Sequence, residues 1–171
     1  MSEETAAVET LDLSTLTATV EETVEETRPL GEPATPDAGG FIWGTGRRKS
    51  SVARVRIKPG DGKFLIKGNG TKDREISDFF SEPQHRAACT APLVATNTEG
   101  KIDIYVNIHG GGITGQAEAI TLGLARALKG YDPTLEQALR DKNYLTRDPR
   151  EVERKKYGQR GARRRFQFSK R

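Results

Sequence analysis

Residues 101–130 read KIDIYVNIHGGGITGQAEAITLGLARALKG, and their hydrophobic period changes halfway along. In 101–109 apolar and polar residues alternate, which predicts a β-strand with one buried face. From Ile113 the apolar residues recur three or four positions apart, which predicts an amphipathic helix that stops at Gly130. This strand and helix, joined by a glycine-rich turn, are the central unit of the predicted fold.

Two shorter stretches upstream predict further strands. Residues 50–58, SSVARVRIK, alternate in the same way as 101–109, with small and branched apolar residues on one side and cations on the other. PGDG at 59–62 is a turn signal. KFLIK at 63–67 is therefore predicted to return beside 50–58 as the second strand of a hairpin.

The remaining elements are predicted to be helical. DREISDFF (73–80) and PQHRAACTA (83–91) are candidates for short helices. Asp132 and Pro133 match the N-cap and first position of a second helix, which should run to about Lys142. The fold class is therefore α+β, a small, mostly antiparallel sheet with helices on one face, in a domain that covers residues 41–146.

The net charge of +4 conceals two parts of opposite sign. Residues 1–40 contain ten acidic side chains and one arginine, and they close in the Pro- and Gly-rich sequence PLGEPATPDAGG. Low hydrophobicity and high net charge predict a disordered extension. Two roles fit such a segment: it shields the basic regions before their partner binds, or it keeps the chain soluble.

Residues 147–171 end the chain in a basic segment whose last eighteen residues read RKKYGQRGARRRFQFSKR. Nine of these eighteen residues are Lys or Arg and none is acidic. Three aromatic rings cannot offset the entropy of ordering such a chain, about 1–2 kcal/mol per residue. The segment is therefore predicted to be a long extended tail that orders on a negatively charged partner.

The sequence predicts no catalytic residue, no metal site and no cofactor. HGGG at 109–112 resembles the oxyanion loop of some esterases, but the chain has no G-x-S-x-G nucleophile. His85 and Cys89 are too few ligands for zinc, and ordinary packing explains them better. One cysteine rules out an internal disulfide, and no apolar run approaches the length of a membrane span. The N-terminus also lacks a secretory signal, so we expect a cytoplasmic protein. Because no catalytic constellation is found, we also expect it to be non-enzymatic.

A basic loop and a basic strand face indicate nucleic acid as the partner. GTGRRKSS at 44–51 is interpreted as a loop in which two glycines free the backbone and three consecutive cations approach phosphates. The outward side of the strand at 50–58 adds three more cations. The cations of these two stretches are Arg47, Arg48, Lys49, Arg54, Arg56 and Lys58.

The glycines of HGGGITGQ, 109–116, admit two interpretations. Gly110, Gly112 and Gly115 match the spacing of a dinucleotide-binding turn, but a helix follows where that fold needs a second strand. The amides at the start of the helix still suit a phosphate, including one in an RNA backbone. Alternatively, the glycines allow tight packing of the strand against the helix.

Four stretches, taken in order, resemble a known family. GTGRRKSSVARVRI, HGGGITGQAEAITLGLARAL, NYLTRDPREVERKKYGQRGARRR and the final QFSKR are similar to bacterial small-subunit ribosomal protein nine, from about Trp43 to Arg171. The resemblance implies a domain docked on ribosomal RNA in the head of the small subunit, beside other head proteins. It also implies a tail that threads through this RNA toward the tRNA in the peptidyl site.

The resemblance and the basic pattern together give the expected contact residues. Contacts with ribosomal RNA are expected at Arg47, Arg48, Lys49, Arg54, Arg56, Gly110, Gly111, Gly112, Gln116, Arg154, Lys155, Lys156, Arg160, Arg163, Arg164 and Arg165. Contacts with tRNA are expected at Ser169, Lys170 and Arg171. Thr121 and Phe166 stand where many family members have Arg and Pro, and residues 1–40 have no counterpart in the family. The alternative function is a nucleoid-type DNA-binding protein that uses the same basic tail.

Overall fold

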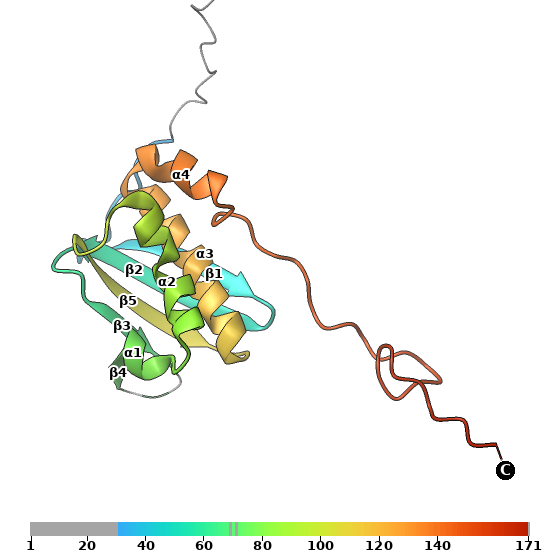
Figure 1. Cartoon of the computed structure of the whole chain (residues 1–171). Helices are drawn as coiled ribbons and strands as arrows, with labels where there is room; N and C mark the ends of the chain where they lie inside the picture. The colour runs from blue at the N-terminus through green and yellow to red at the C-terminus, as the bar shows by residue number, and fades with distance from the viewer. Residues whose placement is uncertain (1–30, 69, 71, 171) are drawn as a thin grey trace, which may run out of the picture. The chain divides into compact units, whose positions relative to one another are not determined.

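The computed structural model describes residues 31–68, 70 and 72–170 (Figure 1). Five strands form one sheet in the order β1-β2-β5-β3-β4, in which only the β3–β5 pair is parallel. The strands are β1 (Ile42–Arg48), β2 (Ser51–Pro59), β3 (Phe64–Lys67), β4 (Asp73–Glu75) and β5 (Ile102–His109). The helices are α1 (Ile76–Phe79), α2 (Pro83–Thr96), α3 (Ile113–Tyr131), the 3-10 helix η2 (Pro133–Leu135) and α4 (Glu136–Asp141). The predicted α+β class is confirmed.

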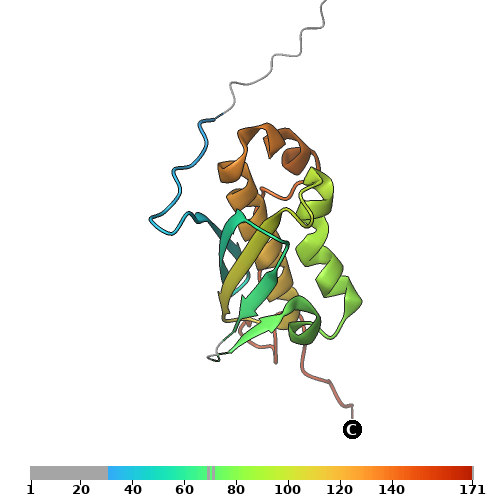
Figure 2. The same cartoon turned by 90° about the vertical axis from the view of Figure 1, so that its left-hand side faces the viewer.

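The central strand and helix form where the sequence predicts them. β5 lies between β2 and β3, and all four of its Ile and Val side chains are buried. α3 packs against β1 and β2, and α2 packs against α3. Figures 1 and 2 show α2 and α3 together on one face of the sheet, as predicted.

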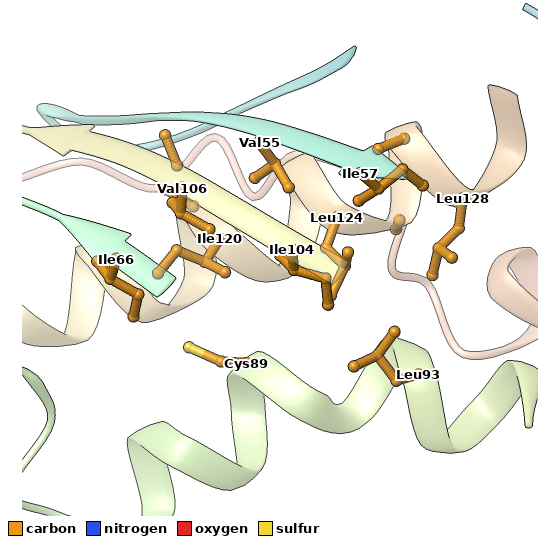
Figure 3. Close-up of a cluster of buried hydrophobic side chains, with 14 of the residues drawn as sticks. Val55, Ile57, Ile66, Cys89, Leu93, Ile104, Val106, Ile120, Leu124 and Leu128 are labelled. Carbon is orange, nitrogen blue, oxygen red and sulfur yellow. The ribbon is translucent and has the colours of Figure 1, made fainter. Parts of the chain in front are cut away.

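The core lies between this face of the sheet and the two helices (Figure 3). Val55 and Ile57 of β2 and Ile104 and Val106 of β5 are among its fully buried side chains. They meet the apolar stripe of α3 and the inner face of α2. Cys89 of α2 is part of this core, so burial raises the pKa of its thiol to about 12 and the cysteine acts as a packing residue.

The predicted hairpin between β2 and β3 is wrong. β3 lies on the far side of β5 and runs parallel to it, with Ile66 opposite Val106. β5 has eight residues and β3 has four, and β5 takes the place beside β2. The chain that follows β2 must therefore pass the start of β5. Asp103, which the alternation placed in solvent, is buried there because its carboxylate accepts the backbone N–H groups of Asp61 and Lys63 at 3.0 and 3.1 Å.

The predicted loop at 44–51 is also wrong over most of its length, because Gly44–Arg48 belong to β1. Gly44 and Gly46 face α3, and because they have no side chain the backbone of β1 packs closely against that of the helix. A Cβ at Gly46 would overlap the carbonyl oxygen of Ala119, and one at Gly44 would lie 2.6 Å from the backbone nitrogen of Ala127. Residues that look like a flexible phosphate loop in the sequence are therefore the contact between an edge strand and a helix.

The other helices differ from expectation mainly at their ends. α2 runs on to Thr96, and residues 73–75 form β4 before the single turn of α1. The helix predicted from Asp132 starts as η2, where the carboxylate of Asp132 accepts the N–H of Thr134 at 2.9 Å, and continues as α4 to Asp141. This end is one residue before the expected one.

The two ends of the described chain have no regular secondary structure. Residues 31–40 contain no helix or strand, although the N–H of Ala34 donates to the carbonyl of Gly130 at 2.8 Å. The rest of the predicted disordered extension, residues 1–30, lies outside the described residues. Between Lys142 and Lys170 the structure again shows only turns and extended chain.

Candidate nucleic-acid interface

The tail presents a row of exposed cations. Side chains from Glu151 to Lys170 are exposed except those of Gln159 and Ala162, which are half-buried. Glu153 pairs with Arg163, whose Nε donates to the carboxylate at 3.1 Å and lowers the pKa of Glu153. Lys156 lies 4.0 Å from the same carboxylate. Within the described part of the tail, the cations without an ion-pair partner are Arg154, Lys155, Arg160, Arg164, Arg165 and Lys170.

A turn in the tail brings one of these cations to an aromatic ring. The N–H of Arg160 donates to the carbonyl of Arg164 at 2.9 Å, which folds the chain back on itself. The Arg160 guanidinium lies 5.3 Å from the ring centroid of Phe166. The ring of Phe166 therefore contacts an arginine of the tail itself.

Arg48 holds the start of the tail against the domain. Its Nη1 donates to the carbonyl of Arg150 at 2.7 Å, and its Nη2 lies 2.9 Å from the carboxylate of Asp148. Its Nε donates to the carboxylate of Glu118 on α3. One guanidinium thus joins β1, α3 and the first residues of the tail.

This placement separates Arg48 from the other predicted RNA contacts. Only 8% of Arg48 is exposed, and its donors already face protein oxygens. Asp148 receives a second arginine, because the side chain of Arg150 also donates to it, and these bonds hold the pKa of the carboxyl well below its usual value. Arg48 therefore positions the tail, and we leave it out of the contact surface.

Three other predicted cations share the sheet face that is turned away from α3. Gly44 and Gly46 point toward α3, so the intervening residues of β1 point to the opposite face. Arg47 lies on this face, and Arg54 and Arg56 of β2 join it. Lys49 is exposed at the tip of the β1–β2 hairpin, where its φ is 50°.

Tight packing explains the first two glycines of the loop at 110–112. Gly110 and Gly111 have φ values of 74° and 65°, and a Cβ on Gly110 would lie 2.6 Å from the carbonyl oxygen of Ser50. Gln116 is engaged by the loop itself, since its side-chain amide donates to the carbonyl of Gly110 at 3.1 Å. Gly112 has open space around it and caps α3 without a side-chain hydrogen bond. Phosphate binding at this helix start remains a prediction.

Sequence reasoning missed the aromatic residues that accompany the cations on the sheet face. Phe41, Trp43 and Tyr105 lie within 6 Å of the charged groups of Arg54, Arg56 or Lys58. The signal was present in WGTGR, residues 43–47, where glycine occupies every second position as one face of a strand would. Reading the two glycines as loop residues concealed it.

The described residues do not form a cluster of metal ligands. Nowhere in 31–68, 70 and 72–170 do three or more His, Cys, Asp or Glu side chains gather as metal ligands would. His85 packs on the ring of Phe80 and shares a hydrogen bond of 3.2 Å with Thr114, as a packed histidine does. None of the helices in the described part of the chain is both long and apolar enough to cross a membrane.

Comparison with known proteins gives consistent matches. The family model described as ribosomal protein S9/S16 matches residues 46–171. The small ribosomal subunit protein uS9 of Thermotoga maritima is 51% identical over 129 residues, which cover 75% of this chain and 95% of the relative. The proteins of the same name from Solidesulfovibrio magneticus and Rhodopirellula baltica are 51% and 52% identical and cover 77% of this chain, with 97% and 93% of their own lengths matched.

Proposed function

We propose, because the chain belongs to the ribosomal protein S9/S16 family, that its domain and its tail bind ribosomal RNA and that its C-terminus contacts tRNA in the peptidyl site. The chain is a structural, non-enzymatic component of the small subunit of the cytoplasmic ribosome. The family assignment favours this role over the nucleoid-type alternative. Proteins of the subunit head are the expected neighbours.

The exposed, mostly unpaired cations of the tail are the observation that carries this proposal. Like charges held close together repel, and binding to a polyanion relieves this repulsion. Arginine predominates in 160–165, and its planar donors suit phosphate oxygens better than a lysine ammonium does. Shape and charge suffice for such binding, so no base sequence needs to be read.

The fixed start of the tail supports the finer proposal that the tail reaches tRNA. Arg48 holds residues 148–150 to the domain, so the remaining chain extends from a defined point. When fully drawn out, twenty residues span on the order of 60 Å, several times the roughly 13 Å radius of gyration of a 100-residue domain. Ser169 and Lys170 end the described tail, and Arg171 lies outside the described residues.

Sedimentation of cell lysates tests this function. The full chain is compared with a chain that ends at Glu153 and with a full-length variant in which Arg163, Arg164 and Arg165 are replaced by Gln. We expect the full chain to follow small subunits through a high-salt wash, and the truncated chain to be released at lower salt because each lost phosphate contact removes roughly 0.7–0.9 from the log–log salt slope. The three-Gln variant should lie between them.

Two outcomes would change the proposal. A full chain that stays at the top of the gradient, or that follows DNA, would overturn the role in RNA binding. A truncated chain that stays bound as firmly as the full one would assign the anchoring to the domain and leave the tail for tRNA.

A further inference from the structure

The second face of the sheet carries an ordered array of rings and cations on β1, β2 and β5. The strand register places Trp43 opposite Arg56, and Arg56 opposite Tyr105. The neighbouring row contains Thr45, Arg54 and Asn107. Residues in one row of a sheet point to the same face, so these side chains all point away from the face covered by α3.

The cations of this face lie against its rings. The Arg54 guanidinium is 5.2 Å from the ring centroid of Trp43, and that of Arg56 is 5.9 Å from the same ring and 5.3 Å from that of Tyr105. Lys58 and Arg56 lie 5.6 and 5.1 Å from the ring of Phe41. Contacts at these distances restrain flexible cationic side chains, so the charges are held in place before any partner arrives.

Within the described part of the chain, the cations of this face form no ion pair. In 31–68, 70 and 72–170 no carboxylate lies within 4 Å of the charged groups of Arg47, Arg54, Arg56 or Lys58. Asp103 lies opposite Lys58 in the register and attracts its charge, but its carboxylate is hydrogen-bonded to the backbone N–H groups of Asp61 and Lys63. Arg54 and Arg56 face no acid on β1 or β5. Acidic side chains return to the sheet only on β4, with Asp73 and Glu75.

The rings give the face a second property that a plain basic patch lacks. Trp43 is 41% exposed although it is the largest apolar side chain of the protein, and Tyr105 is half-buried. Interleaved cations and aromatic rings are the means by which open sheets hold unpaired nucleotides, because phosphates meet the cations while bases stack on the rings. Bases inside a duplex cannot reach such rings.

We propose that this face of β1, β2 and β5 binds an unpaired stretch of ribosomal RNA, with a base stacked on Trp43 and phosphates held by Arg54, Arg56 and Lys58. The proposal rests on the proposed RNA-binding function and adds a second contact to that of the tail. It assigns the missed aromatic residues a role in the same interface.

Trp43 reports on this contact directly, because it is the only tryptophan of the chain. The full chain is titrated with a short single-stranded oligoribonucleotide that carries a dye, and two signals are followed. Anisotropy of the dye reports all binding, including binding by the tail, whereas tryptophan fluorescence reports the sheet face. An oligonucleotide of the same length with abasic sites keeps the phosphates and removes the bases.

We expect the intact oligonucleotide to quench the fluorescence of Trp43 and the abasic one to bind at least about fivefold more weakly with little quenching. Arg56→Gln should weaken the binding that quenches Trp43 several-fold. Arg74→Gln is the matched control. Arg74 is exposed on β4 and lies opposite Ile66, so this substitution removes the same charge from the other side of the sheet. Its effect should stay below about twofold.

Several results would overturn the proposal. Binding seen by anisotropy without quenching would place the RNA on the tail alone, and equal quenching by the abasic oligonucleotide would exclude stacking. Equal losses of RNA affinity in Arg56→Gln and Arg74→Gln would show that only the net charge of the chain matters. A synthetic peptide of residues 1–30 that shifts the Trp43 fluorescence and displaces the RNA would assign the face to the acidic segment of the chain.

The sedimentation experiment separates this proposal from the wider function. If the full chain follows small subunits but Trp43 is not quenched, only the assignment of the sheet face is wrong. If neither result is obtained, the RNA-binding function itself fails.

Discussion

Arg48 and Asp103 show how single buried charges organise longer pieces of this chain. Arg48 is 8% exposed and Asp103 is 6% exposed, and each is paired with groups from a distant segment. A charge in the protein interior is tolerated only when partners replace the water it has lost. Alternation along the sequence predicts the face on which a residue lies, but it does not reveal a segment that later covers that face.

Replacing Arg48 by Gln should loosen the start of the tail. The substitution removes the cation that faces both Glu118 and Asp148 and leaves two carboxylates close together. Because these carboxylates are partly exposed, water compensates part of the loss, and we expect the midpoint of thermal unfolding of the full chain to fall by about 5 °C. Arg47→Gln, an exposed neighbour on the same strand, is the control. Equal midpoints for the two variants would contradict the role of Arg48.

Asp103→Asn should make stability depend less on pH. The N–H of Lys63, foremost, and that of Asp61 lower the pKa of Asp103 in the folded chain, whereas an unfolded Asp titrates near 3.9. The stabilisation by the carboxylate is therefore complete well above pH 4 and is lost as the pH falls toward the folded pKa. At pH 7 the midpoint of urea unfolding of Asp103→Asn should be lower than that of the unchanged chain by at least about 0.5 M. A difference that stays constant down to pH 3 would disprove the carboxylate's part in it.

At the scale of elements, β1 and α3 pack through their backbones. Gly44 and Gly46 of β1 meet Ala119, Gly123 and Ala127 of α3, so small residues line both sides of the contact. The edge strand thereby comes close to the helix, and its outer residues are displayed on the opposite face. The packing of β1 is thus a condition for the array of rings and cations.

Gly46→Ala should therefore cost far more than its size suggests. Its Cβ would overlap the carbonyl of Ala119, and neither backbone can move without repacking the core. We expect a loss of about 2–4 kcal/mol in the free energy of unfolding, measured by urea denaturation. Thr45→Ala, on the exposed side of the same strand, should change it by less than about 0.5 kcal/mol. Similar values for both variants would show that the contact can relax.

At the scale of elements, prediction from sequence succeeded where a local hydrophobic period determines the structure. It failed where contacts with a distant part of the chain determine it. β5 and α3 carry clear periods of two and 3.6 and were predicted almost to the residue. β3 was predicted as a strand, but its partner is β5, which follows some forty residues later and which no local turn signal could indicate. Gly44 and Gly46 were misread because the helix that explains them lies far along the chain.

At the scale of the whole molecule, the candidate interface was predicted in composition but not in arrangement. The basic tail follows from its charge alone, since no such sequence can form a core. The common face of Arg47, Arg54 and Arg56 required the register of β1 and β2, and the inward turn of Arg48 required the tail itself. The rings of Trp43 and Tyr105 join the cations only through pairing across three strands.

The whole chain also combines a basic domain and tail with an acidic N-terminal segment. Residues 1–30 carry eight acidic side chains and one arginine, while residues 41–171 hold 27 bases and 14 acids. A polyanion in the same chain lowers the effective positive potential of a basic surface without any specific contact. This effect weakens binding to any polyanion, and it matters least where many ordered contacts form together.

Removing residues 1–30 should therefore strengthen non-specific binding more than specific binding. We expect the shortened chain to bind an unrelated duplex DNA roughly fivefold more tightly at low salt, as measured by filter binding. The difference should vanish toward 1 M salt, where the Debye length falls to about 3 Å. A full-length chain in which the eight acids are replaced by Gln or Asn is the matched control, and it should behave like the shortened chain because charge, not length, causes the effect. If both variants bind DNA as the full chain does but precipitate at lower concentration, the extension maintains solubility and does not shield the basic surfaces.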